Sequence, residues 1–423
     1  MPAMRPDNSD EPAPISVDDA VARLAEDGRR HFAGGSGAVE SVPLGTAAGR
    51  ILARDLVARF DHPNVNDAAL DGIACRQLDT HDARSDSPVT LRVIGESAAG
   101  RVFGGTLGPG DAVRIQTGAA LPAGADAVVP VERLHEHDGR VAVFEPARRD
   151  AVRPCGQDFH AGEVGLEAGR RLDAAGVALA AAMGYAELPV RARLRVAILT
   201  GGDELVPPGG ELRPGEVFDA NLPTLEALVR TAGAEPLPLA RIGDDASSLH
   251  AVVLNAPAFD LLLSCGGISM GQYDLVRDLL AERGQLIFRK VRLKPGGPAT
   301  FARVDGRPWL ALPGNPVSAA LTFLVLGRAW LDRAVGRSGP LPFAERVPAR
   351  AGAPLRAAGA KTTLLRVSTS WEDGHLVARP AGDQSSSVLR TLTAADALAL
   401  VPENAELAVG DRVELLPLRP QLG

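Results

Sequence analysis

The sequence predicts a multidomain protein of the α/β plus β class. Between about 191 and 335, apolar segments of strand length alternate with helical patterns, which is typical of a largely parallel sheet covered on both faces. Residues from about 62 to 152 and from about 340 to 423 instead form short alternating segments separated by turns, which indicates two smaller β domains. A chain of 423 residues is also too long for one hydrophobic core.

The N-terminal part predicts a lead-in and a divided domain. Residues 1–14 are polar and proline-rich, so we expect them to be disordered. Ser16 is a candidate N-cap, with Asp19 three residues later and an apolar helical face after it. A second helix is expected near Ala174–Met183. The predicted domains are 1–14 (lead-in), 15–61 with 153–190 (one domain), 62–152 (an inserted β domain), 191–338 (α/β) and 339–423 (C-terminal β).

Turn and capping residues predict where the helices and strands of the second half of the chain begin and end. Asn221 is a candidate cap of a helix that ends before Gly233. Asp305–Gly306 predicts a turn between two strands, and a helix over Val317–Leu331 closes the α/β unit. A hairpin is expected at Glu372–Gly374 in the last domain.

Composition excludes several classes of protein. A net charge of −7 and a pI of about 5.7 argue against a nucleic-acid-binding protein. The cysteines Cys75, Cys155 and Cys265 are far apart and form no CxxC motif, so neither disulfides nor a zinc site is predicted. No apolar run approaches the ~18 residues of a membrane span and no signal peptide is visible, so we expect a cytoplasmic protein that does not bind membranes.

The first loop of interest, TGGDEL, follows a predicted strand. The glycine Gly202 lets backbone N–H groups approach a ligand, and Asp203 and Glu204 offer oxygen ligands to a hard cation. An ordinary tight turn with solvated acids explains the same residues.

The second loop, SCGGISMGQYD, resembles an anion cradle. Gly266 and Gly267 free backbone N–H groups, Ser269 adds a hydroxyl, and a helix is predicted to start nearby. Asp274 is a candidate metal ligand and, equally, a candidate N-cap of that helix. Asp244, after another strand of the same sheet, is a candidate metal ligand or, in the favoured interpretation, a cap.

The loop LPGNPVS indicates a binding site more specifically than the two loops before it. Pro313 and Pro316 fix the backbone on either side of Gly314 and Asn315, and a helix starts at once. A rigid loop at a helix N-terminus suits a phosphate group or the edge of a pterin ring. A structural helix start is the alternative interpretation.

Cations precede that loop. Lys290, Arg292 and Lys294 alternate, so we expect them on one face of a strand that leads into PGGP. A row of cations beside acidic loops favours a polyanionic ligand bridged by a metal. A solvated edge strand protected by its charges is the alternative. His135 and His137 flank a turn and are expected to be solvated rather than ligands.

These loops, with LDGIA (70–74), IQTGAALPAGADAVVPVE (115–132) and RPCGQDFHAGE (153–163), resemble the molybdopterin molybdenumtransferases, or molybdenum insertases, over nearly the whole chain. The resemblance implies an elongated N-terminal domain, an inserted β domain, a three-layer α/β molybdopterin-binding domain and a C-terminal β-barrel-like domain. It also implies a homodimer whose cleft lies between the α/β domain of one subunit and the N-terminal half of the other.

The resemblance further implies an enzyme that inserts molybdate into adenylylated molybdopterin and releases AMP with the help of Mg²⁺. Molybdopterin adenylyltransferase and recipient molybdoenzymes are the expected protein partners. Carried over by motif, the cleft residues are the catalytic Asp71, Asp158, Glu204, Lys290 and Lys294, the substrate-binding Thr117, Glu132, Gly202, Asp203, Gly266, Gly267, Ser269, Asp274, Pro313, Gly314, Asn315 and Pro316, and the metal ligands Asp203, Glu204, Asp244 and Asp274.

Some loops differ from the sequence motifs that are usual in the family. Ala68 and Ile73 replace a hydroxyl and a phenol, and Gly297 replaces a cation. Gln157 replaces an acid, and serines replace glycines in DQSSSVL (383–389). A non-catalytic molybdopterin-binding or delivery protein is therefore the second hypothesis.

Overall fold

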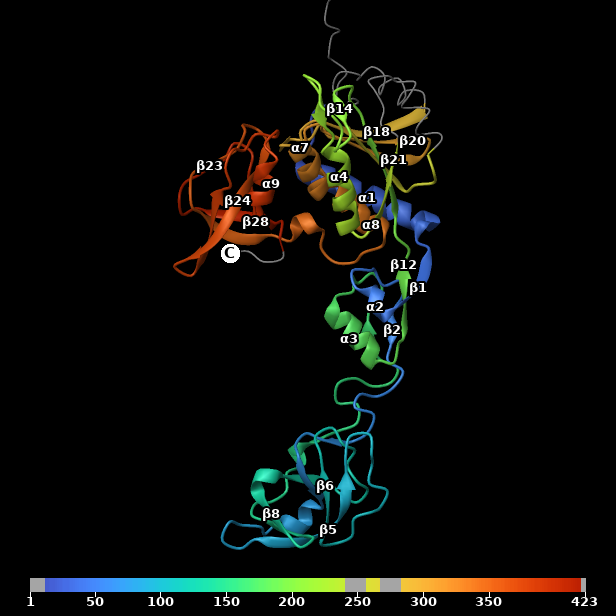
Figure 1. The fold of residues 1–423 in the computed structure, drawn as a ribbon, viewed down its shortest axis with the longest axis vertical. Helices are drawn as coiled ribbons and strands as arrows, with labels where there is room; N and C mark the ends of the chain where they lie inside the picture. Colours follow the sequence, from blue (N-terminus) through green and yellow to red (C-terminus); the bar gives the residue numbers. More distant parts are fainter. Residues whose placement is uncertain (1–11, 240–255, 267–282, 420–423) are drawn as a thin grey trace, which may run out of the picture.

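The computed structural model describes residues 12–239, 256–266 and 283–419. The molecule is long and narrow (Figure 1). The inserted β domain lies at one end, and the elongated domain joins it to the α/β and C-terminal domains, which lie together at the other end.

The α/β domain contains a six-stranded sheet in the order β16-β13-β17-β21-β20-β18. Its strands are β13 (Arg195–Thr200), β16 (Glu235–Pro238), β17 (Leu261–Cys265), β18 (Gly284–Arg289), β20 (Thr300–Val304) and β21 (Arg307–Leu312). The first four strands in the order are parallel and the last two are antiparallel. The carboxyl ends of β13, β17 and β21 therefore share one edge, where ligands of such sheets bind.

Helices cover one face of this sheet. They are α1 (Val17–His31), α4 (Asn221–Thr231), α7 (Pro316–Thr322), the π-helical η5 (Phe323–Gly327) and α8 (Arg328–Ala334). Their apolar residues form one core with Val196, Ile198 and Leu263 of the sheet. The alternate residues Ala197 and Leu199 are buried on the opposite face, as the period of two in a strand requires.

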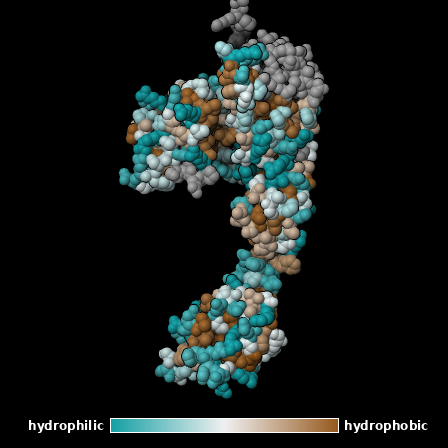
Figure 2. All heavy atoms as spheres, viewed as in Figure 1, coloured by the Kyte–Doolittle hydropathy of each residue, from teal (hydrophilic) through white to brown (hydrophobic). Residues whose placement is uncertain are grey.

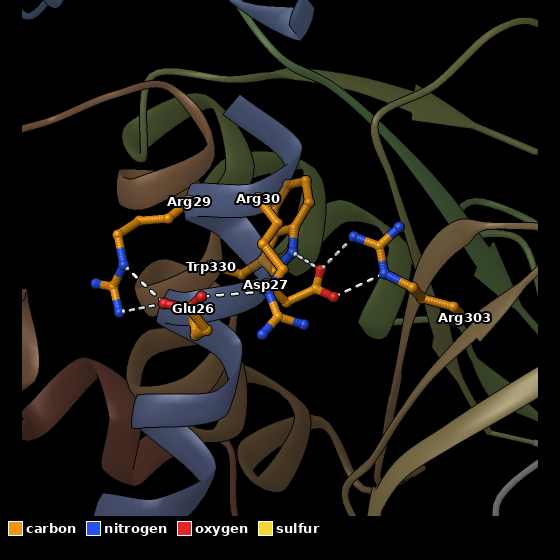
Figure 3. Close-up of polar contacts among 6 residues, drawn as sticks. All are labelled: Glu26, Asp27, Arg29, Arg30, Arg303 and Trp330. Carbon is orange, nitrogen blue, oxygen red and sulfur yellow. Dashed lines mark hydrogen bonds and ion pairs between the residues drawn. The ribbon is translucent and has the colours of Figure 1, made fainter. Parts of the chain in front are cut away.

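Helix α1 is fastened to this domain by a buried carboxylate. Asp27 accepts hydrogen bonds from Arg303 Nε (2.7 Å) and Nη2 (2.9 Å) and from Trp330 Nε1 (2.8 Å), as Figure 3 shows. One turn of the same helix also carries Glu26, which pairs with Arg29 and Arg30. Although the sequence assigned α1 to the elongated domain, it packs on α8.

The elongated domain is built from short pieces. They are η1 (Phe32–Ser36), β1 (Val39–Pro43), α2 (Leu44–Ala47), β2 (Leu56–Val57), β11 (Val164–Leu166), α3 (Ala174–Ala182) and β12 (Glu187–Arg191). Two passes of chain form a neck toward the inserted domain, where the N–H group of His62 donates to Phe159 O (2.9 Å) and that of Asp158 donates to His62 O (2.9 Å).

The inserted domain has a six-stranded sheet in the order β7-β4-β6-β5-β9-β8. Its elements are β3 (Asp67–Ala68), β4 (Gly72–Cys75), η2 (Gln77–Thr80), β5 (Val89–Ser97), β6 (Asp111–Ile115), β7 (Ala127–Pro130), η3 (Val131–Arg133), β8 (Leu134–His137), β9 (Arg140–Val143), η4 (Arg149–Ala151) and β10 (Val152–Arg153).

The C-terminal domain is a barrel closed by β24, β25, β22, β28 and β26. Its elements are η6 (Pro342–Ala344), β22 (Val347–Ala351), β23 (Leu355–Arg356), β24 (Thr362–Glu372), β25 (His375–Pro380), α9 (Arg390–Ala394), β26 (Ala397–Val401), β27 (Glu406–Leu407) and β28 (Arg412–Pro417). Strand β19 (Leu293–Lys294), which comes from the α/β part of the chain, pairs with β24 and ties the two domains together. The short β14 (Leu205–Val206) and β15 (Val217–Phe218) pair beside the α/β domain.

The structure confirms several local predictions and corrects one. Ser16 caps α1 by accepting a hydrogen bond from Asp19 N (3.0 Å), and α3 occupies the predicted segment. The predicted cap Asn221 is wrong, because it is the first residue of α4, and Asp219 Oδ1 caps the helix by accepting from Asn221 N (2.9 Å) and Leu222 N (3.1 Å). In the described part of the chain, no helix has both the length and the apolar character to cross a membrane.

Candidate functional site

Three glycine-containing loops meet at the carboxyl edge of the α/β sheet. A Cβ atom added to Gly266 would lie 2.3 Å from Gly201 O, and one added to Gly314 would lie 3.3 Å from Gly266 Cα. Gly266 also has a φ of 77°, a backbone angle that residues with a side chain rarely adopt. The loops after β13, β17 and β21 therefore approach one another through their backbones, and Gly266 has no room for a side chain.

The buried thiol of Cys265 supports this contact from below. Its Sγ donates to Pro313 O at 3.0 Å, and Gly201 N donates to Cys265 O at 3.1 Å. Burial raises the pKa of this thiol far above its ordinary value. Cys265 therefore stays a protonated donor that positions the LPGNP loop, and it is not a nucleophile.

Asn221 links the same loop to α4, and the sequence analysis missed this role. Its Nδ2 donates to Gly314 O at 2.8 Å. Asp219 uses one oxygen for the cap of α4, and the other accepts from Thr200 Oγ1 at 2.7 Å. Since both oxygens of Asp219 are engaged, this buried carboxylate serves the framework. The run Asp219–Ala220–Asn221 just before a helix was the available signal.

Asp203 and Glu204 are exposed at this edge. The carboxylate of Glu204 folds over Gly202, where an added Cβ would meet Glu204 Oε2 at 2.6 Å. In the part of the chain that the structure describes, no three His, Cys, Asp or Glu side chains form a ready metal site. Two carboxylates nonetheless fit Mg²⁺, which commonly takes one or two of them and completes its shell with water and substrate phosphate. The predicted site residues Asp244, Gly267, Ser269 and Asp274 lie outside the described residues.

The predicted row of cations on one strand is wrong. Strand β18 ends at Arg289, and Lys290 has a φ of 62°, which breaks the alternation. The other described non-glycine residues with positive φ are Asp or Asn, which tolerate this conformation better than lysine does. Arg292 pairs with Glu403 of the C-terminal domain at 2.9 Å, whereas Lys294 is exposed at the start of the PGGP loop.

The serine-rich loop of the C-terminal domain touches this edge. Asn315 Nδ2 donates to Ser386 Oγ at 3.0 Å. Beneath the loop, the fully buried Arg366 donates through Nη2 to Asp383 O (3.0 Å) and Ser385 O (3.1 Å), while its Nε and Nη1 have no partner. Burial lowers the pKa of Arg366. The serines of this loop were noted from the sequence, but Arg366 was not, because an arginine within a β-strand belongs to no recognisable motif.

A second group of predicted residues lies on the inserted domain. Asp71 Oδ1 accepts hydrogen bonds from Thr117 N (2.7 Å) and Thr117 Oγ1 (2.9 Å), and these bonds lower the pKa of Asp71. Asp71 O accepts from Val131 N (3.0 Å), which brings the exposed Glu132 alongside. Asp158 is exposed on the neck that leads to this domain. The hydrogen bonds that orient Asp71 all come from within the inserted domain.

Two of the residues that differ from the usual family motifs lie inside the inserted domain. Ala68 and Ile73 are buried at 0% and 1% exposure inside the inserted domain. Their changed side chains therefore alter packing rather than the surface that a substrate meets.

Within one chain, the structure does not bring the two groups of residues together. The inserted domain and the α/β domain lie at opposite ends of the molecule (Figure 1).

The fold defines a class: a multidomain protein in which an α/β domain, with close-packed loops at the carboxyl edge of its sheet, lies between a divided N-terminal part and a C-terminal barrel. Family models match in order along the chain, namely the MoeA N-terminal region (domains I and II) over 15–184, a probable molybdopterin binding domain over 197–333 and the MoeA C-terminal region (domain IV) over 348–418.

Relatives of known name agree. The chain is 37% identical to molybdopterin molybdenumtransferase 2 of Mycobacterium tuberculosis, over 89% of this chain and 95% of the relative. It is 36% identical to the molybdopterin molybdenumtransferase of a Nostoc species, over 86% and 85%. The crystal structure of the molybdopterin biosynthesis MoeA protein of Pyrococcus horikoshii is similar with a TM-score of 0.81 at 27% identity, covering 95% of this chain and 99% of that one. The chain belongs to the molybdopterin molybdenumtransferase family.

Proposed function

We propose that this protein inserts molybdenum from molybdate into adenylylated molybdopterin and releases AMP. The observation that best supports this proposal is the backbone contact of Gly201, Gly266 and Gly314 at the carboxyl edge of a parallel sheet, beside the exposed carboxylates of Asp203 and Glu204. The names of the relatives supply the reaction, and this edge supplies a place for a phosphorylated pterin.

Different residues would bind the substrate, neutralise charge and hold the metal. The rigid loop from Pro313 to Pro316 and the backbone N–H groups near Gly202 and Gly266 seat the substrate. Lys290 and Lys294 neutralise the negative charge that grows on the leaving phosphate as AMP departs. Asp203 and Glu204 would hold Mg²⁺, which supplies charge neutralisation on the phosphate oxygens.

We further propose that the active unit is a homodimer in which Asp71, Thr117, Glu132 and Asp158 of one subunit face the α/β edge of the other. The separation of the two groups within one chain supports this arrangement (Figure 1). The elongated domain also exposes apolar side chains, at 54% for Val39, 62% for Phe60 and 52% for Val164. Figure 2 shows apolar surface along this part of the molecule. The cytoplasm is the proposed setting, with an adenylyltransferase as donor and molybdoenzymes as recipients.

Release of AMP by the purified protein tests the reaction. Adenylylated molybdopterin is supplied with Mg²⁺, with and without molybdate, and AMP is quantified. Molybdate-dependent release is the expected result. Tight binding of the pterin without release would instead indicate a carrier protein and would overturn the proposed reaction.

Mixed dimers test the shared cleft. Asp71→Asn and Glu204→Gln inactivate opposite halves, so a mixture of the two variants regenerates one intact cleft in each mixed dimer. Partial recovery of AMP release is expected on mixing. The absence of recovery, with mixed dimers verified by mass spectrometry, would contradict a cleft shared between subunits.

A further inference from the structure

A groove on the inserted domain lies beside the pair formed by Asp71 and Thr117. It contains about 1120 Å³ of empty space, part of which is open to solvent. None of the described residues that line it is charged, and most are glycine, alanine or larger apolar residues. They include Val65 and Val102, both exposed, and Gly118, which directly follows Thr117 in the chain. We refer to this surface as the inserted-domain groove.

A loop of the α/β domain also exposes apolar side chains. It comprises residues 205–218, including the paired strands β14 and β15, and we refer to it as the edge loop. Leu212, Val217 and Phe218 are 47%, 49% and 42% exposed. Val217 N donates to Glu204 O at 2.8 Å, which holds the edge loop beside the carboxylates of the α/β edge. Large apolar side chains that gather on a surface mark a contact with another molecule.

The edge loop does not reach the inserted-domain groove of its own chain. The two lie at opposite ends of the molecule, with the elongated domain between them (Figure 1). In the homodimer proposed above, Asp71 and Thr117 of one subunit face Glu204 of the other. Because the groove adjoins Thr117 and the edge loop follows Glu204 directly, the same arrangement brings the groove and the loop together. The geometry therefore favours a second copy of this chain as the occupant of the groove.

The charges next to these apolar residues are complementary. Arg101 directly precedes the lining residue Val102, and its side chain is 76% exposed. Its nearest carboxylate, that of Glu96, is 3.6 Å away, which is too long for a hydrogen bond. On the edge loop, Glu211 directly precedes Leu212, is exposed, and forms no ion pair with any residue that the structure describes. The edge loop carries two glutamates and one arginine, a net charge of −1, so opposite charges would meet.

We propose that the edge loop of one subunit docks into the inserted-domain groove of the other. Leu212 covers Val102 in this contact, and Glu211 pairs with the partner's Arg101. Burial of apolar surface stabilises the contact, and the charge pair selects its register. The inference rests on the proposed shared cleft and adds to it, because it identifies what holds the inserted domain of one subunit against the α/β edge of the other.

Charge reversal in the full-length protein tests the pair. Arg101→Glu and Glu211→Arg should each lower AMP release at low substrate concentration by about fivefold, because like charges then meet. The double variant should recover most of the activity, since the reversed charges attract again. Asp82→Arg is the control: it adds a cation to the inserted domain outside the groove, so it should not rescue Arg101→Glu. Absence of recovery in the double variant would contradict the pair, because damage to the fold cannot be repaired by a second reversal.

Cross-linking tests the docking without relying on catalysis. Val102→Cys and Leu212→Cys are placed in separate, differently tagged subunits that carry Cys155→Ser, since the other two cysteines are buried. After the subunits are mixed, a short bismaleimide should join the two tags. Asp82→Cys in place of Val102→Cys should not cross-link, although its native side chain is 85% exposed.

The outcomes separate this inference from the proposed function. Mixed dimers that restore AMP release from the Asp71 and Glu204 variants, but give no specific cross-link, would overturn the docking and leave the shared cleft in place. Failure of those dimers to restore AMP release, again without a cross-link, would overturn both. A cross-link that an excess of adenylylated molybdopterin abolishes would show that the groove holds the substrate, and this result would also overturn the proposal.

Discussion

The inserted domain and the α/β edge present their predicted site residues in opposite ways. On the inserted domain, Asp71 is an exposed side chain oriented by two hydrogen bonds from Thr117. At the α/β edge, the exposed side chains of Asp203 and Glu204 stand beside backbone that is packed so closely that Gly266 lies against Gly201. The inserted domain therefore orients one side chain by hydrogen bonds, whereas the α/β edge also depends on a close backbone contact.

This difference separates function from stability. A side chain that projects into solvent can change without loss of the fold, whereas a backbone contact cannot. We therefore expect substitution of Asp71 to reduce activity alone, and substitution at the glycine contact of the α/β edge to reduce stability as well.

The largest expected loss of stability comes from Gly266→Ala. The added Cβ meets Gly201 O at 2.3 Å, and the φ of 77° is unfavourable for alanine. We expect the free energy of unfolding to fall by about 3 kcal/mol or more, as measured by urea denaturation. Gly306→Ala is the matched control, with a φ of 76° but no atom within 4 Å of the added Cβ. It should cost only about 1 kcal/mol. Equal losses would show that the close contact contributes nothing.

Asp71→Asn should remove activity and leave stability intact. Asparagine keeps an oxygen that can accept from Thr117 but loses the charge, so AMP release should fall by about 100-fold or more. The free energy of unfolding should change by less than about 0.5 kcal/mol. Asp82→Asn, at a carboxylate with 85% side-chain exposure in the same domain, is the control and should be fully active. Full activity of the Asp71 variant would rule out a role for its charge.

Ser386→Ala tests the contact between the C-terminal loop and the α/β edge. Loss of the hydrogen bond from Asn315 should weaken docking of the loop by about 1 kcal/mol. Hydrogen exchange of residues 383–389 should then be about fivefold faster. Ser387→Ala removes a hydroxyl that bonds within the loop, to Ser385. If both variants exchange at the same rate, the contact with Asn315 does not hold the loop.

The smallest expected effect concerns pH. Hydrogen bonds from Thr117 N and then Thr117 Oγ1 lower the pKa of Asp71 below its ordinary value of 3.8. The stabilisation from this ionised carboxylate is therefore present above pH 3.8 and is lost as the pH falls through the lower pKa of the folded state. NMR titration of Asp71 should show that lowered pKa, and Thr117→Val, which removes only the hydroxyl donor, should move the pKa part of the way back toward 3.8. An unchanged pKa in the Thr117 variant would contradict this cause.

Local sequence signals predicted much of the fold. The cap at Ser16, helix α3 and the turn at Asp305–Gly306 all depend on neighbouring residues, and the structure contains each of them. The family resemblance was confirmed because its motifs occur in order along most of the chain. The roles assigned to the site residues remain predictions.

Contacts between distant segments were not predictable. Period-two reasoning placed Lys290 and Lys294 on one strand, but a left-handed residue at Lys290 and pairing of β19 with the C-terminal barrel override it. The sequence predicted Asn221 as the cap of α4, but the capping residue is Asp219, two residues earlier. The side chain of Asn221 instead donates to Gly314 O, 93 residues away. Arg366 was missed for the same reason, since its role depends on a loop that returns to it.

The attachment of α1 through Asp27 has a consequence for biosynthesis. Trp330 is 303 residues downstream of Asp27, so α1 cannot find its partner on the ribosome until nearly the whole α/β domain has been translated. The inserted domain contains its own sheet and core, so it can fold earlier. At about 5–20 residues per second, the apolar face of α1 waits tens of seconds for its partner. We therefore expect nascent chains stalled before α8 to expose this helix and to be the forms that chaperones bind.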